Sequence, residues 1–322
     1  MLGMRSRAGD EGRRRATPVG VLATVGALTV ATSAVIAISV ADLGTAGDTS
    51  TIGTPPAASQ PVSEDDRDLL YRAEQVLLRT CMAEQGFRYW PMPEQPAPDY
   101  RQFSYVVTDV AWAKKHGYGR DIELQIQRES RNSPPVKYSE GLSEQRRQAL
   151  GVAMSGPEPV GLAVANPIGG TLTHSDKGCT ATVWKQLYGD PQAWFAAHAI
   201  TLNLGAIRAD RASSDPAFVA GVDRWRTCMR PLGYTDRDPA ALRGRTLSTP
   251  GLTRAQEIRA ATAEATCATT AGLASIARQV DHRYQLALQD EYRSTFTSMW
   301  SMQRAALRLA HSVLAGASDQ VR

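Results

Sequence analysis

The sequence predicts a mainly α-helical domain, cross-linked by disulfides, that follows one N-terminal transmembrane helix of the signal-anchor type. Three observations predict this class. A long uncharged stretch follows a cluster of arginines near the N-terminus. Helix-capping residues recur along the rest of the chain, whereas alternating apolar runs are scarce. Four cysteines accompany a motif that occurs twice, at residues 79–87 and 226–234.

Residues 1–16 form a basic tail, which we expect in the cytoplasm. The chain has a net charge of +4, and the tail supplies three of these units because its five arginines outnumber one aspartate and one glutamate. The rest of the chain is therefore almost neutral. Nucleic-acid-binding domains usually have a basic face on their folded part. The sequence thus predicts no nucleic-acid partner.

Residues 17–40 contain no charged side chain and follow closely after Arg13, Arg14 and Arg15. As a helix they would span about 36 Å, enough for a hydrocarbon core of about 30 Å. The arginines favour a cytoplasmic N-terminus and an external remainder. The alternative is a cleaved signal peptide, because small residues from Gly44 to Ala46 could form a cleavage site.

Both alternatives place the folded part outside the cytoplasm. An uncleaved segment would make the chain a single-pass protein of the cell membrane with its C-terminal domain extracellular, whereas cleavage would release it as a secreted protein. Residues 41–62 are small, polar and proline-rich, which predicts a flexible tether. Residues 63–322 are then the extracytoplasmic helical domain, and the lipid around residues 17–40 is its first expected partner.

The clearest helix covers residues 63–85, where apolar side chains recur every three or four positions. Ser63 and Asp66 form a capping pair at its start, and Gly86 ends it. The sequence predicts further helix starts at Thr108, Ser143, Ser175, the Asp-Pro pairs at Asp190, Asp215 and Asp238, and the capping box of Thr253 with Gln256.

From Thr253 to about Leu314 almost every residue favours a helix, with Gly272 as the one expected interruption. Apolar side chains trace one stripe there, which predicts a long amphipathic helix packed on the domain. Strand signals are confined to the runs near Tyr105 and Gly161. Residues 87–142 are rich in proline and polar side chains, so we expect loops with short helices there.

The repeated motif reads Arg-Thr-Cys-Met, three further residues, Gly and an aromatic residue. If the glycine occupies the left-handed position after a helix, the methionine lies in the last turn and the aromatic residue two positions beyond the cap. This is the spacing of the apolar contact that accompanies a Schellman ending. Helix termination therefore explains the methionine, the glycine and the aromatic residue, but it does not explain the cysteine.

The cysteines Cys81, Cys179, Cys228 and Cys267 are the site residues that the sequence predicts. Each motif copy is followed by one further cysteine in a later helix, so the duplication favours Cys81–Cys179 and Cys228–Cys267 among three connectivities. A zinc site and a thioredoxin-like role both require a C-x-x-C spacing that the sequence lacks. We also expect Trp184 and Trp225 to pack around the two disulfides.

These motifs resemble those of an uncharacterised group of actinobacterial exported, membrane-anchored helical proteins. The stretches that carry the resemblance are "CMAEQGF", "DKGCTATVWKQLYGD" and "WRTCMRPLGY", and it extends over about residues 63–300. Proteins of this group accompany ABC-type exporters and other cell-envelope proteins. The resemblance implies an envelope protein or an ABC-type transporter as partner, and it implies no activity.

Two stretches superficially indicate hydrolytic chemistry. His174, Ser175 and Asp176 contain the residue types of a catalytic triad, but neighbours in the chain rarely converge on one point. Glu129, followed by Ser130 and Pro134, is similar to the catalytic acid of lytic transglycosylases. The Gly-Leu-Met-Gln stretch of those enzymes is incomplete, because only its first two residues follow.

The leading hypothesis is a non-enzymatic, membrane-tethered domain outside the cytoplasm that binds an envelope or transporter partner. No sequence pattern indicates a cofactor or a metal site, and no catalytic residue is assigned. The first alternative is a peptidoglycan-acting enzyme that uses Glu129. The second is a module that binds or senses a small molecule.

Overall fold

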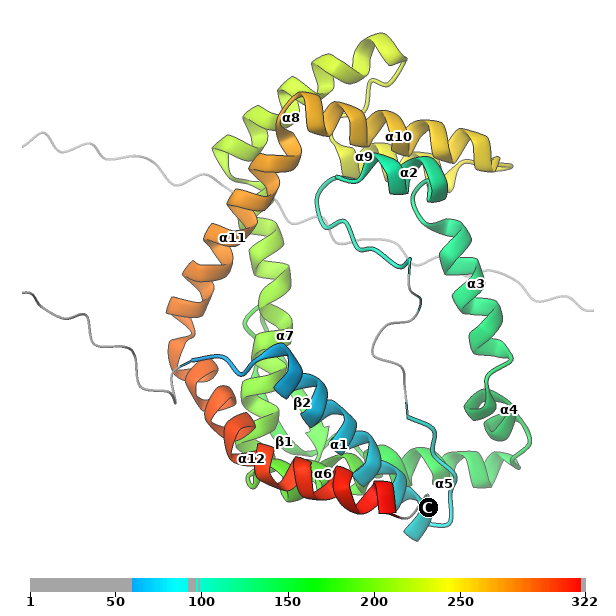
Figure 1. Cartoon of the computed structure of the whole chain (residues 1–322), viewed down its shortest axis with the longest axis vertical. Helices are drawn as coiled ribbons and strands as arrows, with labels where there is room; N and C mark the ends of the chain where they lie inside the picture. Colours follow the sequence, from blue (N-terminus) through cyan, green and yellow to red (C-terminus); the bar gives the residue numbers. More distant parts are fainter. Residues whose placement is uncertain (1–59, 92–96, 98, 320–322) are drawn as a thin grey trace, which may run out of the picture. The chain divides into compact units, whose positions relative to one another are not determined.

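The computed structural model describes residues 60–91, 97 and 99–319 (Figure 1). Helices dominate these residues, as the sequence predicts. In chain order the elements are α1 (Glu64–Glu84), α2 (Val110–His116), α3 (Arg120–Arg131), α4 (Pro134–Glu140), α5 (Glu144–Ser155), β1 (Gly161–Ala165), β2 (Thr171–Ser175), α6 (Gly178–Tyr188), α7 (Pro191–Ser213), α8 (Pro216–Met229), α9 (Pro239–Ser248), α10 (Arg254–Thr270), α11 (Leu273–Glu291) and α12 (Arg293–Asp319).

The predicted tail (1–16), membrane segment (17–40) and most of the tether lie outside the described residues. Within the part that the structure describes, no helix combines the length and the apolar character that a membrane crossing requires. The last residues of the tether are described, and Val62 among them is buried. Its carbonyl accepts a hydrogen bond of 3.1 Å from Arg67, so packing begins slightly before Ser63.

Six of the twelve described α-helices begin at the predicted capping residues. The hydroxyls of Ser63 and Ser143 accept backbone N–H groups in the first turns of α1 and α5. Each of the three aspartates before a proline accepts at least one N–H from the first turn of its helix. Thr253 and Gln256 form the expected capping box at the start of α10. Short-range hydrogen bonding therefore fixes the helix boundaries.

Two predicted helix starts are wrong. Asp109 rather than Thr108 caps α2, because its carboxylate accepts the N–H of Trp112 at 2.9 Å. Helix α6 begins only at Gly178, beyond the predicted cap Ser175. Ser175 ends β2 instead, so its backbone belongs to the strand pair and the helix must start later.

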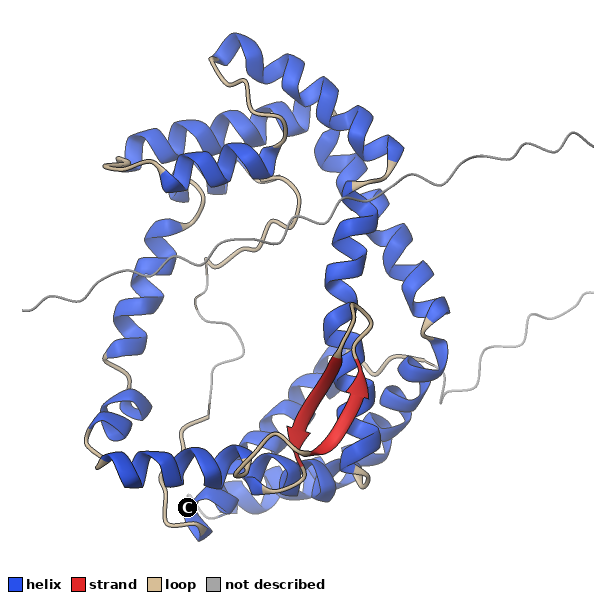
Figure 2. Ribbon diagram, turned by 180° about the vertical axis from the view of Figure 1, so that it is seen from behind, coloured by secondary structure: helices blue, strands red, loops and turns tan. Residues whose placement is uncertain are grey.

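One of the two predicted strand regions forms a sheet. Strands β1 and β2 pair antiparallel, with Gly161 opposite Ser175, and the hairpin packs on α7 (Figure 2). The apolar run near Tyr105 is not a strand. Val106 and Val107 are buried between helices there, and the N–H of Val107 donates to the side chain of Glu264 rather than to a neighbouring strand.

The first copy of the motif ends α1 as expected. Gly86 has a φ of 75°, the left-handed conformation that glycine adopts without strain. The N–H of Phe87 donates to the carbonyl of Met82 at 2.9 Å, and the N–H of Gly86 donates to the carbonyl of Ala83 at 2.9 Å. These two hydrogen bonds define a Schellman ending. Phe87 and Met82 are both buried in the same core.

The second copy ends α8 in the same way, with a tighter last turn. Gly233 has a φ of 84°, and the N–H of Tyr234 donates to the carbonyl of Met229 at 3.3 Å. Residues Arg230–Leu232 form a 3₁₀ turn that contains Pro231. Proline lacks the N–H that an α-helical turn needs, so the regular helix stops at Met229.

A first hydrophobic core joins α1, α6 and α12 with the start of α7. The disulfide Cys81–Cys179 links α1 to α6 within it. Trp184 is partly buried and packs on this core, as predicted. The largest buried side chains of the core are Leu70, Leu77, Leu78, Met82, Phe87, Leu187, Tyr188 and Trp194.

A second core lies between α8, α10 and α11. The disulfide Cys228–Cys267 links α8 to α10, and the predicted packing of Trp225 beside it is confirmed. Trp225 has no exposed surface, and its indole N–H donates to the carbonyl of Glu264 at 3.3 Å. Each copy of the motif therefore contributes a cysteine and a methionine to a core of its own.

The C-terminal region consists of three helices rather than one helix with a single interruption. Gly272 separates α10 from α11 as predicted, but a second break at Tyr292 separates α11 from α12. The apolar stripe is consequently divided. Ile276 packs on the second core, whereas Met299 and Val313 pack on the first.

Candidate functional site

The predicted site residues are the four cysteines, and the structure pairs them as expected into Cys81–Cys179 and Cys228–Cys267. One cysteine of each pair is buried, because Cys179 and Cys267 are each 1% exposed. The cysteines are thus core residues. In the described part of the chain, no group of three or more histidine, cysteine, aspartate or glutamate residues is placed to hold a metal ion.

The stretch from His174 to Asp176 does not have the geometry of a triad. Nδ1 of His174 lies 2.8 Å from the carbonyl oxygen of Ser175, and the His174 ring packs against Trp184. The Ser175 hydroxyl accepts the N–H of Lys177 at 3.2 Å. The serine and histidine side chains thus form local contacts at the end of the hairpin and before the start of α6.

Glu129 lies on the exposed last turn of α3. Its Oε1 accepts a hydrogen bond of 2.8 Å from the side-chain amide of Gln125, one helical turn away. A catalytic acid for glycoside cleavage needs an environment that keeps it protonated near neutral pH, usually burial. Glu129 instead lies at an exposed position.

A cluster of buried charges surrounds the short helix α2, where the sequence analysis placed no site. Two glutamates of α10 face it. Glu257 is 3% exposed, and its Oε1 accepts the N–H groups of Tyr118 at 2.9 Å and Arg120 at 3.3 Å. It therefore takes the place of a cap at the start of α3, where Gly119 has no side chain to offer.

Glu264, seven positions further along α10, is fully buried. Its carboxylate accepts the N–H of Val107 at 2.8 Å, the hydroxyl of Tyr118 at 2.8 Å and Nη2 of Arg243 at 3.4 Å. Burial raises the pKa of Glu264, although Arg243 and the two other donors oppose the shift. Burial, followed by the charge of Glu264, likewise raises the pKa of the Tyr118 hydroxyl.

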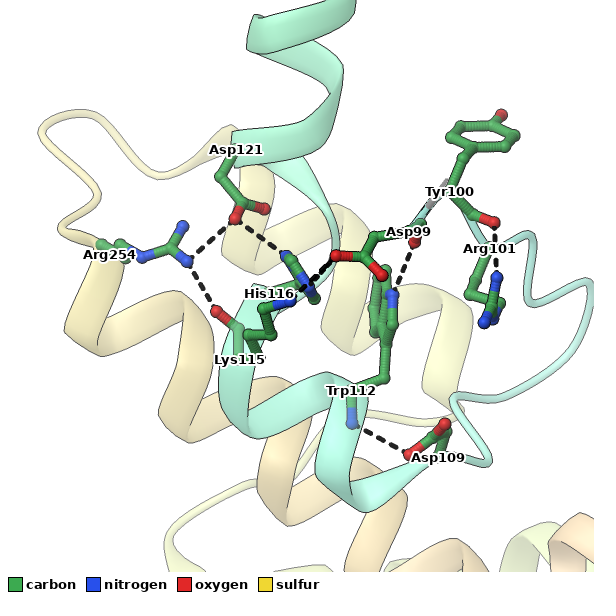
Figure 3. Close-up of polar contacts among 9 residues, drawn as sticks. All are labelled: Asp99, Tyr100, Arg101, Asp109, Trp112, Lys115, His116, Asp121 and Arg254. Carbon is green, nitrogen blue, oxygen red and sulfur yellow. Dashed lines mark hydrogen bonds and ion pairs between the residues drawn. The ribbon is translucent and has the colours of Figure 1, made fainter. Parts of the chain in front are cut away.

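On the other side of α2, His116 lies between two aspartates (Figure 3). Its Nδ1 is 2.9 Å from Oδ2 of Asp121, and its Nε2 is 3.6 Å from Oδ2 of Asp99. Arg254 donates to Asp121 at 2.9 Å, and Lys115 donates to Asp99 at 2.8 Å. Besides its contact with His116, each aspartate thus has an arginine or a lysine as partner.

These contacts lower the pKa of both aspartates. For Asp99 the hydrogen bond from Lys115 is the largest cause. For Asp121 burial would raise the pKa, but the hydrogen bonds from Arg254 and His116 outweigh it. His116 itself is 6% exposed and packs against the ring of Trp112. A substrate could not reach its ring nitrogens, so the histidine joins the segment around Asp99 to α2 and α3.

A cavity of about 320 Å³ opens next to this cluster. Its wall consists of residues 101–104 together with Val107, Tyr118 and Arg243. The part of the lining that the structure describes contains two arginines and no carboxylate, histidine or cysteine. Such a surface offers hydrogen-bond donors and positive charge, which suits binding of an anion.

The sequence contained a signal for this cluster. Glu257 and Glu264 are seven residues apart, hence on one face of α10, and the positions between them on that face are alanines such as Ala260 and Ala261. Two acidic residues on the alanine-rich buried face of a helix indicate buried carboxylates that need donors. Two of the donors, Val107 and Tyr118, come from positions more than a hundred residues away.

Comparison with known proteins adds no relative. No protein family, curated protein or solved structure matches the chain.

Proposed function

We propose that this chain is a non-enzymatic helical domain, held on the outer side of the membrane by residues 17–40, that binds a protein partner in the cell envelope, such as an ABC-type transporter. The observation that carries the location is the pair of disulfides, one in each core. Structural disulfides persist in oxidising compartments and are rare in the cytosol. The arginines before residue 17 supply the matching orientation.

The hydrogen bonds of the buried carboxylates support a binding role rather than a catalytic one. Glu257 and Glu264 accept backbone N–H groups from the segment around α2. Asp215 accepts the N–H of Ala217 at the start of α8 and the hydroxyl of Tyr284 on α11. These carboxylates therefore join neighbouring elements. A catalytic carboxylate would instead face a cavity that substrate can enter.

The outer surface offers positions for a protein partner. Helices α7 and α11 pack together, and each has an exposed leucine: Leu202 is 67% exposed and Leu286 is 51% exposed. Large apolar side chains at exposed helix positions are typical of helix-in-groove contacts. They are the first positions at which to search for a partner.

The location is tested by alkylating thiols in acid-quenched cells that express the full-length chain, followed by intact mass measurement. We expect no alkylated cysteine in the wild type, and four in a variant that lacks residues 1–40 and stays in the cytosol. Retention of residues 17–40 in the mature mass supports the tether. Four free thiols in the wild type would contradict export, and a mass that lacks the N-terminal segment would contradict the tether alone.

The partner is tested by placing a photo-crosslinking amino acid at Leu202 or Leu286 in the full-length chain. Gln279, an exposed position of α11, serves as the matched control. We expect one discrete crosslinked product from at least one leucine position in intact membranes and none from Gln279. The absence of any position-specific product, at normal protein levels, would count against a stable protein partner.

A further inference from the structure

We propose that the cavity beside Arg243 is a binding site for a small oxyanion, that is, a compact molecule with a carboxylate or phosphate group. This site is distinct from the membrane tether and from the protein-binding role proposed above. The cavity measures about 320 Å³, which falls at the lower end of the range of small-molecule sites.

Arg243 is the central donor. Its Nη1 donates to the carbonyl of Phe103 at 3.0 Å, and its Nη2 donates to Glu264 at 3.4 Å. Its Nε is buried and has no hydrogen-bond partner among the described residues, so the terminal nitrogens are the ones that a ligand could contact. Each terminal nitrogen of a guanidinium carries two N–H donors in a fixed planar fork, so Nη1 and Nη2 each keep one N–H that these two contacts do not engage. Its side chain remains 27% exposed, at the wall of the cavity.

The guanidinium is also held in place. Its central carbon lies 5.6 Å from the ring centroid of Tyr118, and the Tyr118 hydroxyl is bonded to Glu264 at 2.8 Å. Phe103 is also fixed, because its carbonyl accepts from Arg243 and its ring packs edge-on against Trp112 at 5.0 Å. A donor that is positioned before binding costs little entropy when a ligand arrives.

The charge of the lining selects an anion. Arg101 and Arg243 contribute two positive charges, whereas no carboxylate is among the described residues of the lining. Glu264, the carboxylate that Arg243 contacts, is fully buried and does not belong to the lining. Paired arginines recognise carboxylate and phosphate groups through parallel N–H···O hydrogen bonds. The hydroxyl of Ser104 adds a polar group.

The rest of the lining restricts the size and shape of the ligand. Phe103 and Val107 supply apolar surface beside the two arginines. A cavity of this volume accommodates a small organic acid or a phosphate monoester. It does not accommodate a folded polymer, so we expect a soluble metabolite-sized ligand.

The test is isothermal titration calorimetry of the purified full-length chain in detergent, at constant ionic strength, with two probes: sodium succinate and inorganic phosphate. We expect saturable binding of at least one probe with one site per chain. Preference for succinate would assign the carboxylate class, and preference for phosphate would assign the phosphate class. A rise in thermal stability with the logarithm of the probe concentration above the Kd should accompany binding.

Three variants locate the site. Arg101→Gln and Arg243→Gln should each weaken binding about tenfold or more, because each removes a charged donor. Arg128→Gln, which removes an exposed arginine of α3, should leave the affinity unchanged. Arg243→Lys keeps the charge but loses the planar fork, so we expect an intermediate affinity.

Arg243→Gln could disturb folding, because Arg243 also contacts Phe103 and Glu264. Arg101 lies on an exposed stretch, so Arg101→Gln keeps the test informative if the other variant fails to fold. Circular dichroism and intact disulfides establish folding of each variant. The proposal is overturned if neither probe binds the wild type, or if folded Arg101→Gln binds as tightly as the wild type.

Discussion

The hydroxyl of Tyr118 donates a hydrogen bond of 2.8 Å to the carboxylate of Glu264, and this contact joins α10 to the turn before α3. Tyr118 is also bound through its backbone, because its N–H donates to Glu257 at 2.9 Å. Two carboxylates on one face of α10 thus hold a segment that contains little regular structure of its own. The stability of this region should depend on the protonation of Glu264.

Because burial raises the pKa of Glu264 above its ordinary value near 4.5, the folded chain binds the Glu264 proton more tightly than the unfolded chain does. The resulting contribution to stability is fully present below that ordinary value. It is lost as the pH rises through the raised pKa of the folded state. We expect the free energy of unfolding of the wild type to fall over this window relative to that of Glu264→Gln, which cannot titrate.

The measurement is urea unfolding of both proteins at several pH values above 4.5. Glu129→Gln is the matched control, since Glu129 is an exposed glutamate and its removal should leave the pH profile of the wild type intact. Parallel profiles for the wild type and Glu264→Gln would show that Glu264 does not titrate differently in the folded chain.

Gly117 is required where α2 ends, because its backbone passes close to α10. Its φ is 65°, and a Cβ atom there would lie 2.8 Å from the side chain of Glu257. We expect Gly117→Ala to lower the free energy of unfolding by about 1–3 kcal/mol, from backbone strain and steric overlap. Urea unfolding at neutral pH measures the loss.

Gly151 is the matched control for this substitution. It lies within α5, and a Cβ atom there would meet nothing within 4 Å. Gly151→Ala should therefore stabilise the chain by about 0.5–1 kcal/mol, since alanine loses less backbone entropy in a helix. If Gly117→Ala did not lower the free energy of unfolding relative to Gly151→Ala, the close approach of the end of α2 to Glu257 would be incorrect.

Each disulfide should stabilise its own core. The cross-links close loops of 98 residues for Cys81–Cys179 and 39 residues for Cys228–Cys267. In the chain-entropy account such loops differ little, and removing either bond should cost about 2–5 kcal/mol. We therefore expect Cys81→Ser/Cys179→Ser and Cys228→Ser/Cys267→Ser to lose similar amounts of stability.

Reductant provides the control for the disulfide variants. It should lower the Tm of the wild type and of both double variants, but not that of a variant that lacks all four cysteines. A wild type whose Tm does not respond to full reduction would show that the bonds contribute little to the folded state.

The features that the sequence predicted well depend on residues close together in the chain. A helix cap such as Ser63 or Asp190 is decided by the next few backbone N–H groups, and those partners are visible in the sequence. The Schellman endings at Gly86 and Gly233 are local for the same reason. The pairing of the cysteines became predictable only because the motif occurs twice.

The features that the sequence did not reveal depend on distant partners. Val107 bonds to a side chain 157 positions later, so an apolar run with the composition of a strand became a buried loop. Ser175 could cap a helix by its composition, but pairing with Gly161 made it the end of a strand. The candidate anion site depends on Arg243 meeting residues 101–104, and no local pattern indicates that contact.

Substitution of the glycine should cost similar stability in the two copies of the motif. Substitution of the aromatic residue should cost different amounts. Gly86→Ala and Gly233→Ala each place a side chain on a left-handed backbone, which costs about 1–2 kcal/mol. Phe87 is 5% exposed and belongs to the first core, whereas Tyr234 is only partly buried. We therefore expect Phe87→Ala to cost about 3–5 kcal/mol, and Tyr234→Ala to cost clearly less.

Urea unfolding of the four variants, with Phe87→Leu as a conservative control, separates termination of the helix from packing. Phe87→Leu keeps an apolar contact with Met82 and should recover most of the loss. Equal losses at both aromatic positions would mean that the C-terminal contact of the Schellman ending, rather than burial in the core, determines the energy. In that case the greater exposure of Tyr234 would not reduce the cost of removing its ring.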